Sequence, residues 1–358
     1  MFTKTIMALA LTIGTASGTM AATKHQSAPS GHEKFEARLM KISEPAPQDM
    51  VEFVVGNMLF VGFHEMGHAL AGQLHLPILG RAEDAADSFA TLALLNEGSE
   101  FSVKVLVQAA RGMFLMDRRD RKNGDAPDFY DAHSLDQQRA FQIVCLMVGS
   151  DAKQFKELAD WVHLPESRQR SCRDDYDSAQ TAWQSVLKPH LRSANQPNSA
   201  IEVAYEAGRG KLDNYARSFR SIGLLETFAA YVSSRYVLPR PIALVMTSCG
   251  GPNAWWDPPT LKEAICYELA DDFVDLYQGY TSQGKTVNKL MSKNVSRIHL
   301  AQNASTGSLE AGSGLPEAQA TQDQLEKLAL NLEGETAAFF TQSANGKAAL
   351  AAKSGKRR

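Results

Sequence analysis

The longest apolar stretch of the sequence predicts a helix over residues 50–74. Apolar side chains would point from almost every face of this helix, as they do in helices enclosed by other elements. Leu76-Pro77 and Gly80 follow, and both favour an end to the helix. Amphipathic patterns predict further helices over residues 83–95, 101–116, 134–192 and 224–236. The chain up to residue 236 is therefore expected to be mainly helical.

Short apolar and extended segments replace the helical pattern after Pro241. Residues 242–246 predict one strand, and residues 253–256 predict a second extended piece between turns rich in glycine and proline. Residues 264–267 predict a third strand, which leads into a helix that ends near Tyr277. The expected fold class is mainly α, within the α+β class, with a small β-hairpin element.

Both ends of the chain differ in composition from the domain expected at residues 50–280. In residues 1–22 a lysine precedes a short apolar run and then small residues, which is the layout of a cleavable signal peptide. The apolar run is too short to span a bilayer. Residues 23–49 are expected to form a linker and N-terminal segment, and residues 281–358 a low-complexity, largely mobile tail with one helix around residues 322–332. We therefore expect a periplasmic or secreted protein without stable membrane insertion after signal cleavage.

The overall charge of the chain is close to neutral. Lysine and arginine total 37 against 40 acidic residues, which gives a net charge of −3. This balance provides no global basic field that would hold nucleic acid or an anionic membrane. Function is therefore expected to depend on a local site.

Four cysteines lie in a chain that we expect to be exported. In an oxidising compartment an even number of thiols usually pairs, and four cysteines allow three connectivities. The pairings closest in sequence are Cys145 with Cys172 and Cys249 with Cys266. Because no Cys-x-x-Cys spacing occurs, a thiolate zinc site or a thioredoxin-like redox centre has little support.

The predicted helix over residues 50–74 contains the sequence His64-Glu65-Met66-Gly67-His68. Residues four apart on a helix share one face and lie about 6 Å apart along the axis, so His64 and His68 can bind one metal ion. Glu65 points to the flank of the two imidazoles, from which its carboxylate can reach a water on the metal. This geometry is that of the zinc metalloprotease motif. The apolar neighbours favour a metal, because buried carboxylates are costly unless they are paired or linked to one.

A catalytic zinc site needs a third protein ligand and leaves the fourth position to water. The turn after His68 leads to an acidic segment that contains Glu83, Asp84 and Asp87. Glu83 and Asp87 would share a helix face, so one can bind metal while the other steadies a ligand histidine. Asp84 competes for the ligand position. Acidic residues that open a helix are also favoured by its dipole, which is an alternative explanation of the segment.

The two motifs together resemble those of a known enzyme family. His-Glu-x-Gly-His, followed by Glu-x-x-Ala-Asp-x-Phe-Ala, is similar to the zincin metallopeptidases that use a glutamate as third ligand, including the prenyl-protein peptidases. The resemblance implies that His64, His68 and Glu83 are zinc ligands. It also implies that Glu65 is the general base and Asp87 the carboxylate behind a ligand histidine.

Residues 76–84 also resemble a bacterial domain-of-unknown-function family whose name records an inferred metallopeptidase activity. Further similar pieces lie between about residues 50 and 280, among them Asp131-Ala132-His133, Gln138-Arg139 and Cys266-Tyr267-Glu268. This resemblance implies a zincin-like fold and names no substrate. By residue type and by the match to this pattern, His133 and Tyr267 are candidate catalytic donors to the oxyanion of an acyl-transfer reaction. Each can also be a structural residue.

The sequence Asn253-Ala254-Trp255-Trp256 is similar to the edge strand with which thermolysin-like enzymes bind the substrate backbone. An extended peptide can add to such an edge through main-chain hydrogen bonds. That strand precedes the zinc helix in those enzymes and follows it here, so equivalence requires a rearranged topology. Asn253, Ala254 and Trp255 are the candidate substrate-binding residues, and a hairpin with packed tryptophans is the alternative.

These features predict an exported metallopeptidase that hydrolyses peptide or protein substrates with Zn²⁺ as cofactor and Glu65 as general base. One alternative is a zinc-stabilised protein that binds an extended peptide without cutting it. Another is a zinc amidase that acts on cell-wall peptide, for which the same site residues would serve.

Overall fold

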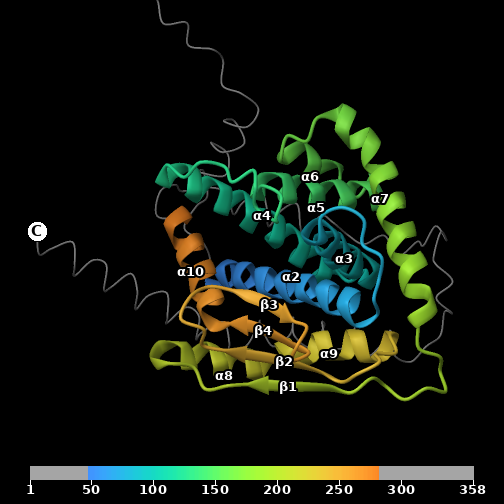
Figure 1. The fold of residues 1–358 in the computed structure, drawn as a ribbon. Helices are drawn as coiled ribbons and strands as arrows, with labels where there is room; N and C mark the ends of the chain where they lie inside the picture. Colours follow the sequence, from blue (N-terminus) through green and yellow to red (C-terminus); the bar gives the residue numbers. More distant parts are fainter. Residues whose placement is uncertain (1–46, 282–358) are drawn as a thin grey trace, which may run out of the picture.

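The computed structural model of the protein describes residues 47–281 (Figure 1). The helices are α2 (Pro47–Gln73), α3 (Ala82–Glu97), α4 (Glu100–Asn123), α5 (Asp136–Ser150), α6 (Lys156–Trp161), α7 (Glu166–Leu187), α8 (Asp213–Ile222), α9 (Leu224–Arg235) and α10 (Tyr267–Thr281). The strands are β1 (Ile201–Tyr205), β2 (Ile242–Thr247), β3 (Ala254–Asp257) and β4 (Lys262–Cys266). The predicted mainly α fold of the α+β class is confirmed.

Helix α2 lies at the centre of the molecule, between the helices α3 to α7 and a layer that contains the sheet, α8 and α9 (Figure 1). Its apolar side chains are buried on all sides, among them Val51, Phe53, Met58, Leu59 and Phe63. A glycine allows one neighbour to approach closely, since a Cβ at Gly62 would lie 2.1 Å from the ring of Phe228 in α9. The expected buried helix is therefore present, and α3, α4, α9, α10, β3 and β4 pack against it.

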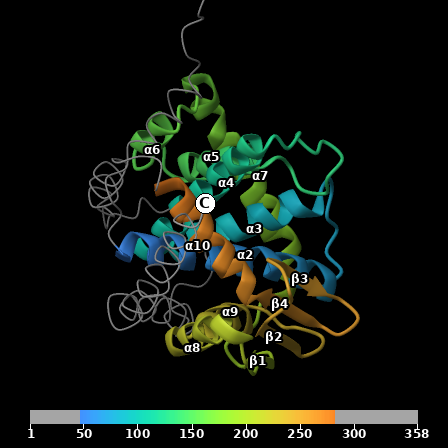
Figure 2. The ribbon, with the colours of Figure 1, turned by 90° about the vertical axis from the view of Figure 1, so that its left-hand side faces the viewer.

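The four strands form one mixed sheet in the order β1-β2-β4-β3. β1 and β2 are parallel, as are β2 and β4, whereas β3 runs antiparallel to β4. The predicted hairpin is thus the β3–β4 part of a larger sheet. Helix α2 packs against β3 and β4, and the perpendicular view shows the sheet on the same side of α2 as α8 and α9 (Figure 2). β3 is an edge strand that lies beside the central helix.

The predicted helix boundaries agree best with the structure where the apolar pattern in the sequence is long. The stretch over residues 134–192 contains α5, α6 and α7 rather than one continuous helix, and Pro165 precedes the start of α7. Helix α4 continues past residue 116 through a polar segment to Asn123, and Gly124 caps its C-terminus. β1 and α8 were not predicted from the sequence. The expected signal peptide, the tail and its helix around residues 322–332 lie outside the described residues.

Two disulfides connect parts of the fold. Cys145 pairs with Cys172 and joins α5 to α7. Cys249 pairs with Cys266 and joins the segment after β2 to the end of β4. Of the three possible connectivities, the structure has the one that joins cysteines closest in sequence. Within residues 47–281, no helix is both long and apolar enough to cross a membrane.

Candidate metal centre

His64 and His68 extend from one face of α2 toward Glu83 in the first turn of α3. Their Nε2 atoms are 3.2 Å apart. Oε2 of Glu83 lies 3.0 Å from Nε2 of His64 and 3.1 Å from Nε2 of His68. The loop between the helices reverses the chain with Gly80 at a φ of 93°, a conformation that glycine adopts readily. Three donor atoms from two helices therefore converge at one point.

These distances fit a tetrahedral metal site. Zinc binds nitrogen and oxygen ligands at about 2.0–2.1 Å, which separates neighbouring ligand atoms of a tetrahedron by about 3.3 Å. Two imidazoles and one carboxylate are a donor set of catalytic zinc sites, whereas Mg²⁺ and Ca²⁺ prefer oxygen ligands. Within the described residues a second cluster, Cys249, Cys266 and Glu268, has similar spacing, but its two sulfurs form a disulfide. The His64–His68–Glu83 cluster is therefore the candidate metal centre.

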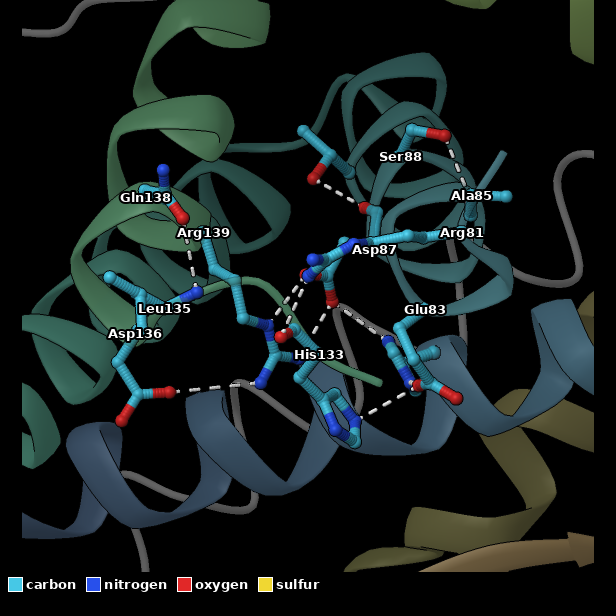
Figure 3. Close-up of polar contacts among 12 residues, drawn as sticks. Arg81, Glu83, Ala85, Asp87, Ser88, His133, Leu135, Asp136, Gln138 and Arg139 are labelled. Carbon is cyan, nitrogen blue, oxygen red and sulfur yellow. Dashed lines mark hydrogen bonds and ion pairs between the residues drawn. The ribbon is translucent and has the colours of Figure 1, made fainter. Parts of the chain in front are cut away.

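Asp87 contacts the ring nitrogen of His64 that lies away from the cluster, and Arg139 binds Asp87. Oδ1 of Asp87 lies 2.8 Å from Nδ1 of His64. Arg139, from the first turn of α5, donates from Nε to Oδ2 of Asp87 at 2.7 Å and from Nη2 to Oδ1 at 2.9 Å (Figure 3). Burial would raise the pKa of Asp87, but the hydrogen bonds from Arg139 and His64 outweigh it and lower this pKa to about 2. Asp87 is therefore a carboxylate, and it favours a proton on Nδ1 of His64 that leaves Nε2 free for a metal.

The electrostatic field at His64 favours a cation. Burial would lower the pKa of His64, but its hydrogen bonds to Asp87 and Glu83 outweigh burial and raise the pKa to about 9. The same two carboxylates would attract a metal ion that takes the place of the proton.

Glu83, rather than its neighbour Asp84, faces the histidines. Hydrogen bonds from His133, His64 and His68 lower the pKa of Glu83 far below its ordinary value. The side chain of Asp84 is exposed. The structure thus brings Glu83 into the cluster and leaves Asp84 outside it.

Glu65 lies on the flank of the cluster that faces the sheet. Its Oε2 accepts a hydrogen bond from the backbone N–H of Trp256 in β3 at 3.0 Å. Burial raises the pKa of Glu65, and the charges of His64 and His68 oppose that rise. A carboxylate in this setting is suited to accept a proton, because it is close to the metal centre without being part of it.

His133 reaches the cluster from the loop between α4 and α5. Its Nε2 lies 2.9 Å from Oε2 of Glu83, on a side chain that is 45% exposed. Oδ1 of Asp131 accepts the backbone N–H of His133 at 2.7 Å and lies 3.2 Å from its Nδ1. Arg81 donates to the carbonyl of His133 at 3.0 Å (Figure 3). This predicted site residue therefore stands at the solvent side of the metal centre.

Tyr267 has a different place. It is fully buried, and its hydroxyl donates to the backbone carbonyl of Glu206 at 2.8 Å, just after β1. Burial raises the pKa of this hydroxyl further above its ordinary value. The structure shows this second predicted oxyanion donor in a contact with the sheet and not with the metal centre.

The predicted substrate-binding residues Asn253, Ala254 and Trp255 lie at the start of β3. Asn253 accepts the N–H of Cys266 through its carbonyl and the N–H of Ala254 through its side chain. The contact between this strand and Glu65 comes from Trp256, the next residue along. The edge strand β3 and the candidate metal centre are thus neighbours in space, although β3 follows α2 by almost two hundred residues in the sequence.

Sequence reasoning assigned no role to Arg139, Trp256 or Glu263. Arg139 is separated from Asp87 by 52 residues and Trp256 from Glu65 by 191, so no local pattern connects them. The available signal for Arg139 was its place beside Gln138 in the segment after His133. Glu263 occupies a strand position next to Lys262 and carries no motif.

Comparison with known proteins identifies one family. The sequence model of the family described as "Putative metallopeptidase" matches residues 26–187 and 206–301, which is most of the chain. No curated protein matches the chain, and no solved structure does.

Proposed function

Since the chain belongs to this metallopeptidase family, we propose that it is an exported zinc peptidase that hydrolyses peptide bonds in peptide or protein substrates. One observation carries the proposal: Nε2 of His64, Nε2 of His68 and Oε2 of Glu83 lie within 3.0–3.2 Å of one another. The carboxylate of Glu65 stands beside them without joining them. This is the division between metal ligands and general base that the chemistry requires.

Zinc bound by these residues would polarise the carbonyl of a peptide bond and lower the pKa of water. Glu65 then accepts a proton from the attacking water and passes it to the leaving amine. The N–H of Trp256 keeps one oxygen of Glu65 in place for both steps. Asp87 and Arg139 maintain the orientation of His64.

His133 is our proposed donor to the oxyanion, because it is half-exposed and lies at the same cluster. Asp131 contacts its ring from the other side. Tyr267 has no part in this proposal, since its hydroxyl is bound within the sheet.

The substrate would lie along β3. A strand at the edge of a sheet offers backbone groups to an extended peptide. In an antiparallel pair, residues that bond to the partner strand alternate with residues whose backbone N–H and C=O groups point away from it. Because the carbonyl of Asn253 accepts from Cys266 in β4, the backbone groups of Ala254 and Trp256 point away from β4. Ala254 and Trp256 therefore present their backbone toward the side where Glu65 lies. The two disulfides are consistent with export, because such bonds persist in oxidising compartments.

The test separates metal binding from hydrolysis. His64→Ala should lose stoichiometric zinc in elemental analysis, and Glu65→Gln should retain zinc but lose turnover by at least about 100-fold. His75→Asn, an exposed histidine outside the cluster, is the matched control and should retain both properties. Full zinc in His64→Ala would contradict the ligand assignment, and undiminished hydrolysis by Glu65→Gln would contradict the role of the base.

Substrate choice is tested on the wild-type protein. New amino termini in a peptide mixture support the peptidase, whereas intact peptide that stays bound to the zinc-loaded protein supports a binding function. Release of fragments from cell-wall peptide but not from protein would assign the same residues to an amidase.

A further inference from the structure

Glu263 is a buried acid that the proposed mechanism does not use. It lies in β4 with none of its surface exposed. Neither of its carboxyl oxygens has a hydrogen-bond partner among residues 47–281. A buried carboxyl without a partner is costly, and an ionised one more so. The position therefore calls for an explanation beyond packing.

The neighbours of Glu263 within the sheet are apolar. Its register partners are Leu244 in β2 and Trp256 in β3, and paired residues point to the same face of a sheet. Trp256 packs against α2, since its Nε1 lies 3.2 Å from where a Cβ at Gly72 would stand. Glu263 thus faces the central helix together with Trp256.

The charged group that acts on Glu263 from this helix is Glu65. Burial and the negative charge of Glu65 both raise the pKa of Glu263 well above its ordinary value. Leu244 and Trp256, from the flanking strands, carry no charge that could offset them. Two carboxyls in one apolar space do not both ionise readily. Because the backbone N–H of Trp256 donates to Glu65, whereas Glu263 has no donor among the described residues, the proton is expected to remain on Glu263.

We propose that Glu263 is a positioning residue that stays protonated and donates its O–H, through one water, to the oxygen of Glu65 that Trp256 does not hold. The inference rests on the proposed function, in which Glu65 is the base. The two donors would together fix the carboxylate plane of Glu65. The proton stays on Glu263 throughout, so no transfer step is added to the reaction.

The protonation state can be measured without any activity. Infrared spectra of the full chain at neutral pH should contain the carbonyl band of a protonated carboxylic acid, and Glu263→Gln should remove it. Glu202→Gln is the matched control, because Glu202 is an exposed glutamate of the same sheet. A spectrum that is the same in wild type and Glu263→Gln would overturn the proposal.

The pH dependence of unfolding provides a second measurement. A folded-state pKa above the ordinary 4.5 means that the stability contributed by Glu263 is fully present below pH 4.5 and is lost as the pH rises toward the folded-state pKa. Relative to Glu263→Gln, the unfolding constant of wild type should therefore increase about tenfold per pH unit above that value. In a Glu65→Gln background the same rise should level off at a lower pH, because the negative charge that raises the folded-state pKa of Glu263 is gone. Equal pH curves for wild type and Glu263→Gln would contradict a protonated Glu263.

The positioning role predicts a difference between two substitutions. Glu263→Met has no donor and should lower kcat about tenfold or more with little change in KM, whereas Glu263→Gln retains an N–H donor and should remain within about threefold of wild type. Zinc content should be equal in both. Equal kcat in Glu263→Met and wild type would overturn the proposal, and so would an equal loss in both variants.

The two hypotheses fail in distinguishable ways. If wild type cleaves no peptide, the proposed function fails while the infrared band and the pH-dependent stability still report on Glu263. If Glu65→Gln abolishes cleavage but Glu263→Met does not affect it, the proposed function stands and the positioning role is wrong.

Discussion

The two sides of the candidate metal centre, the His64–His68–Glu83 cluster, are stabilised in opposite ways. Toward α3 and α5, the polar groups behind His64 form a chain of charged partners: Arg139 donates to both oxygens of Asp87, and Asp87 contacts His64. Toward the sheet, Glu65 has one backbone N–H, and Glu263 has no partner among the described residues. Charge pairing on the first side favours a fixed metal ligand. Burial on the second side raises the pKa of both carboxyls, and a raised pKa helps a general base to accept a proton during the reaction.

The largest expected effect of breaking this contrast comes from Arg139→Met. The side chains of Arg139 and Asp87 are 14% and 5% exposed, so loss of the guanidinium leaves a buried carboxylate with only His64. We expect a loss of about 3–5 kcal/mol in the unfolding free energy of the metal-free protein and a zinc affinity lowered by about 10- to 100-fold. Denaturant titration and zinc competition measure the two effects.

Arg139→Lys is the control for that prediction, because lysine retains the charge but not the paired donors. The unfolding free energy and the zinc affinity of Arg139→Lys should both lie between the values of the wild type and those of Arg139→Met. A loss below about 1 kcal/mol in Arg139→Met would show that Asp87 is held without the guanidinium.

A smaller effect concerns acid stability. Because the pKa of Asp87 is lowered to about 2 from 3.8, its contribution is present above pH 3.8 and is lost as the pH falls through about 2. The shift corresponds to about 2 kcal/mol. As the pH falls through this range, the unfolding free energy of Asp87→Asn should therefore decrease less than that of the wild type. Denaturant titration of the metal-free protein at each pH measures the decrease. Asp84→Asn, changed at an exposed neighbour, should follow the wild-type curve, and parallel curves for all three would contradict the prediction.

The smallest expected effect compares one tryptophan from each side. Nε1 of Trp183 donates to Ser88 at 2.9 Å on the α3 side, whereas the buried Nε1 of Trp256 has no partner among the described residues. Both substitutions lose packing, but Trp183→Phe also loses a hydrogen bond. It should therefore lower the free energy of unfolding by about 1 kcal/mol more than Trp256→Phe does. Thermal and chemical denaturation measure the difference, and a larger loss for Trp256→Phe would reverse the contrast between the sides.

Sequence patterns were sufficient for the features that depend on short spacings. The apolar run predicted α2, and a spacing of four placed His64 and His68 on one face of it. The resemblance to zincins pointed to Glu83 and Asp87, which the structure brings to these histidines. A helix repeats every 3.6 residues, so its face can be derived from the order of residues alone.

The remaining features depend on contacts between distant segments. Arg139 and Trp256 lie in segments that resemble known motifs, and Glu263 lies in none, but no pattern in the sequence relates any of them to His64 or Glu65. Their relation to the candidate centre appears only when α5 packs on α3 and the sheet packs on α2. β1 was missed because it is short and alternates exposed with partly buried residues, so it lacks the continuous apolar run of β2. Tyr267 was considered for its residue type, which does not show that its hydroxyl is bound to Glu206.

The disulfide between Cys249 and Cys266 has a consequence in chain entropy. The bond closes a loop whose ends are 17 residues apart in sequence, and both Trp256 and Glu263 lie inside it. Closing a loop of this length removes about 3 kcal/mol of conformational freedom from the unfolded chain. The segment that carries Trp256 and Glu263 is thus joined covalently at both ends. The conformational order of this segment therefore depends on the oxidation of two sulfurs that lie outside the candidate metal centre.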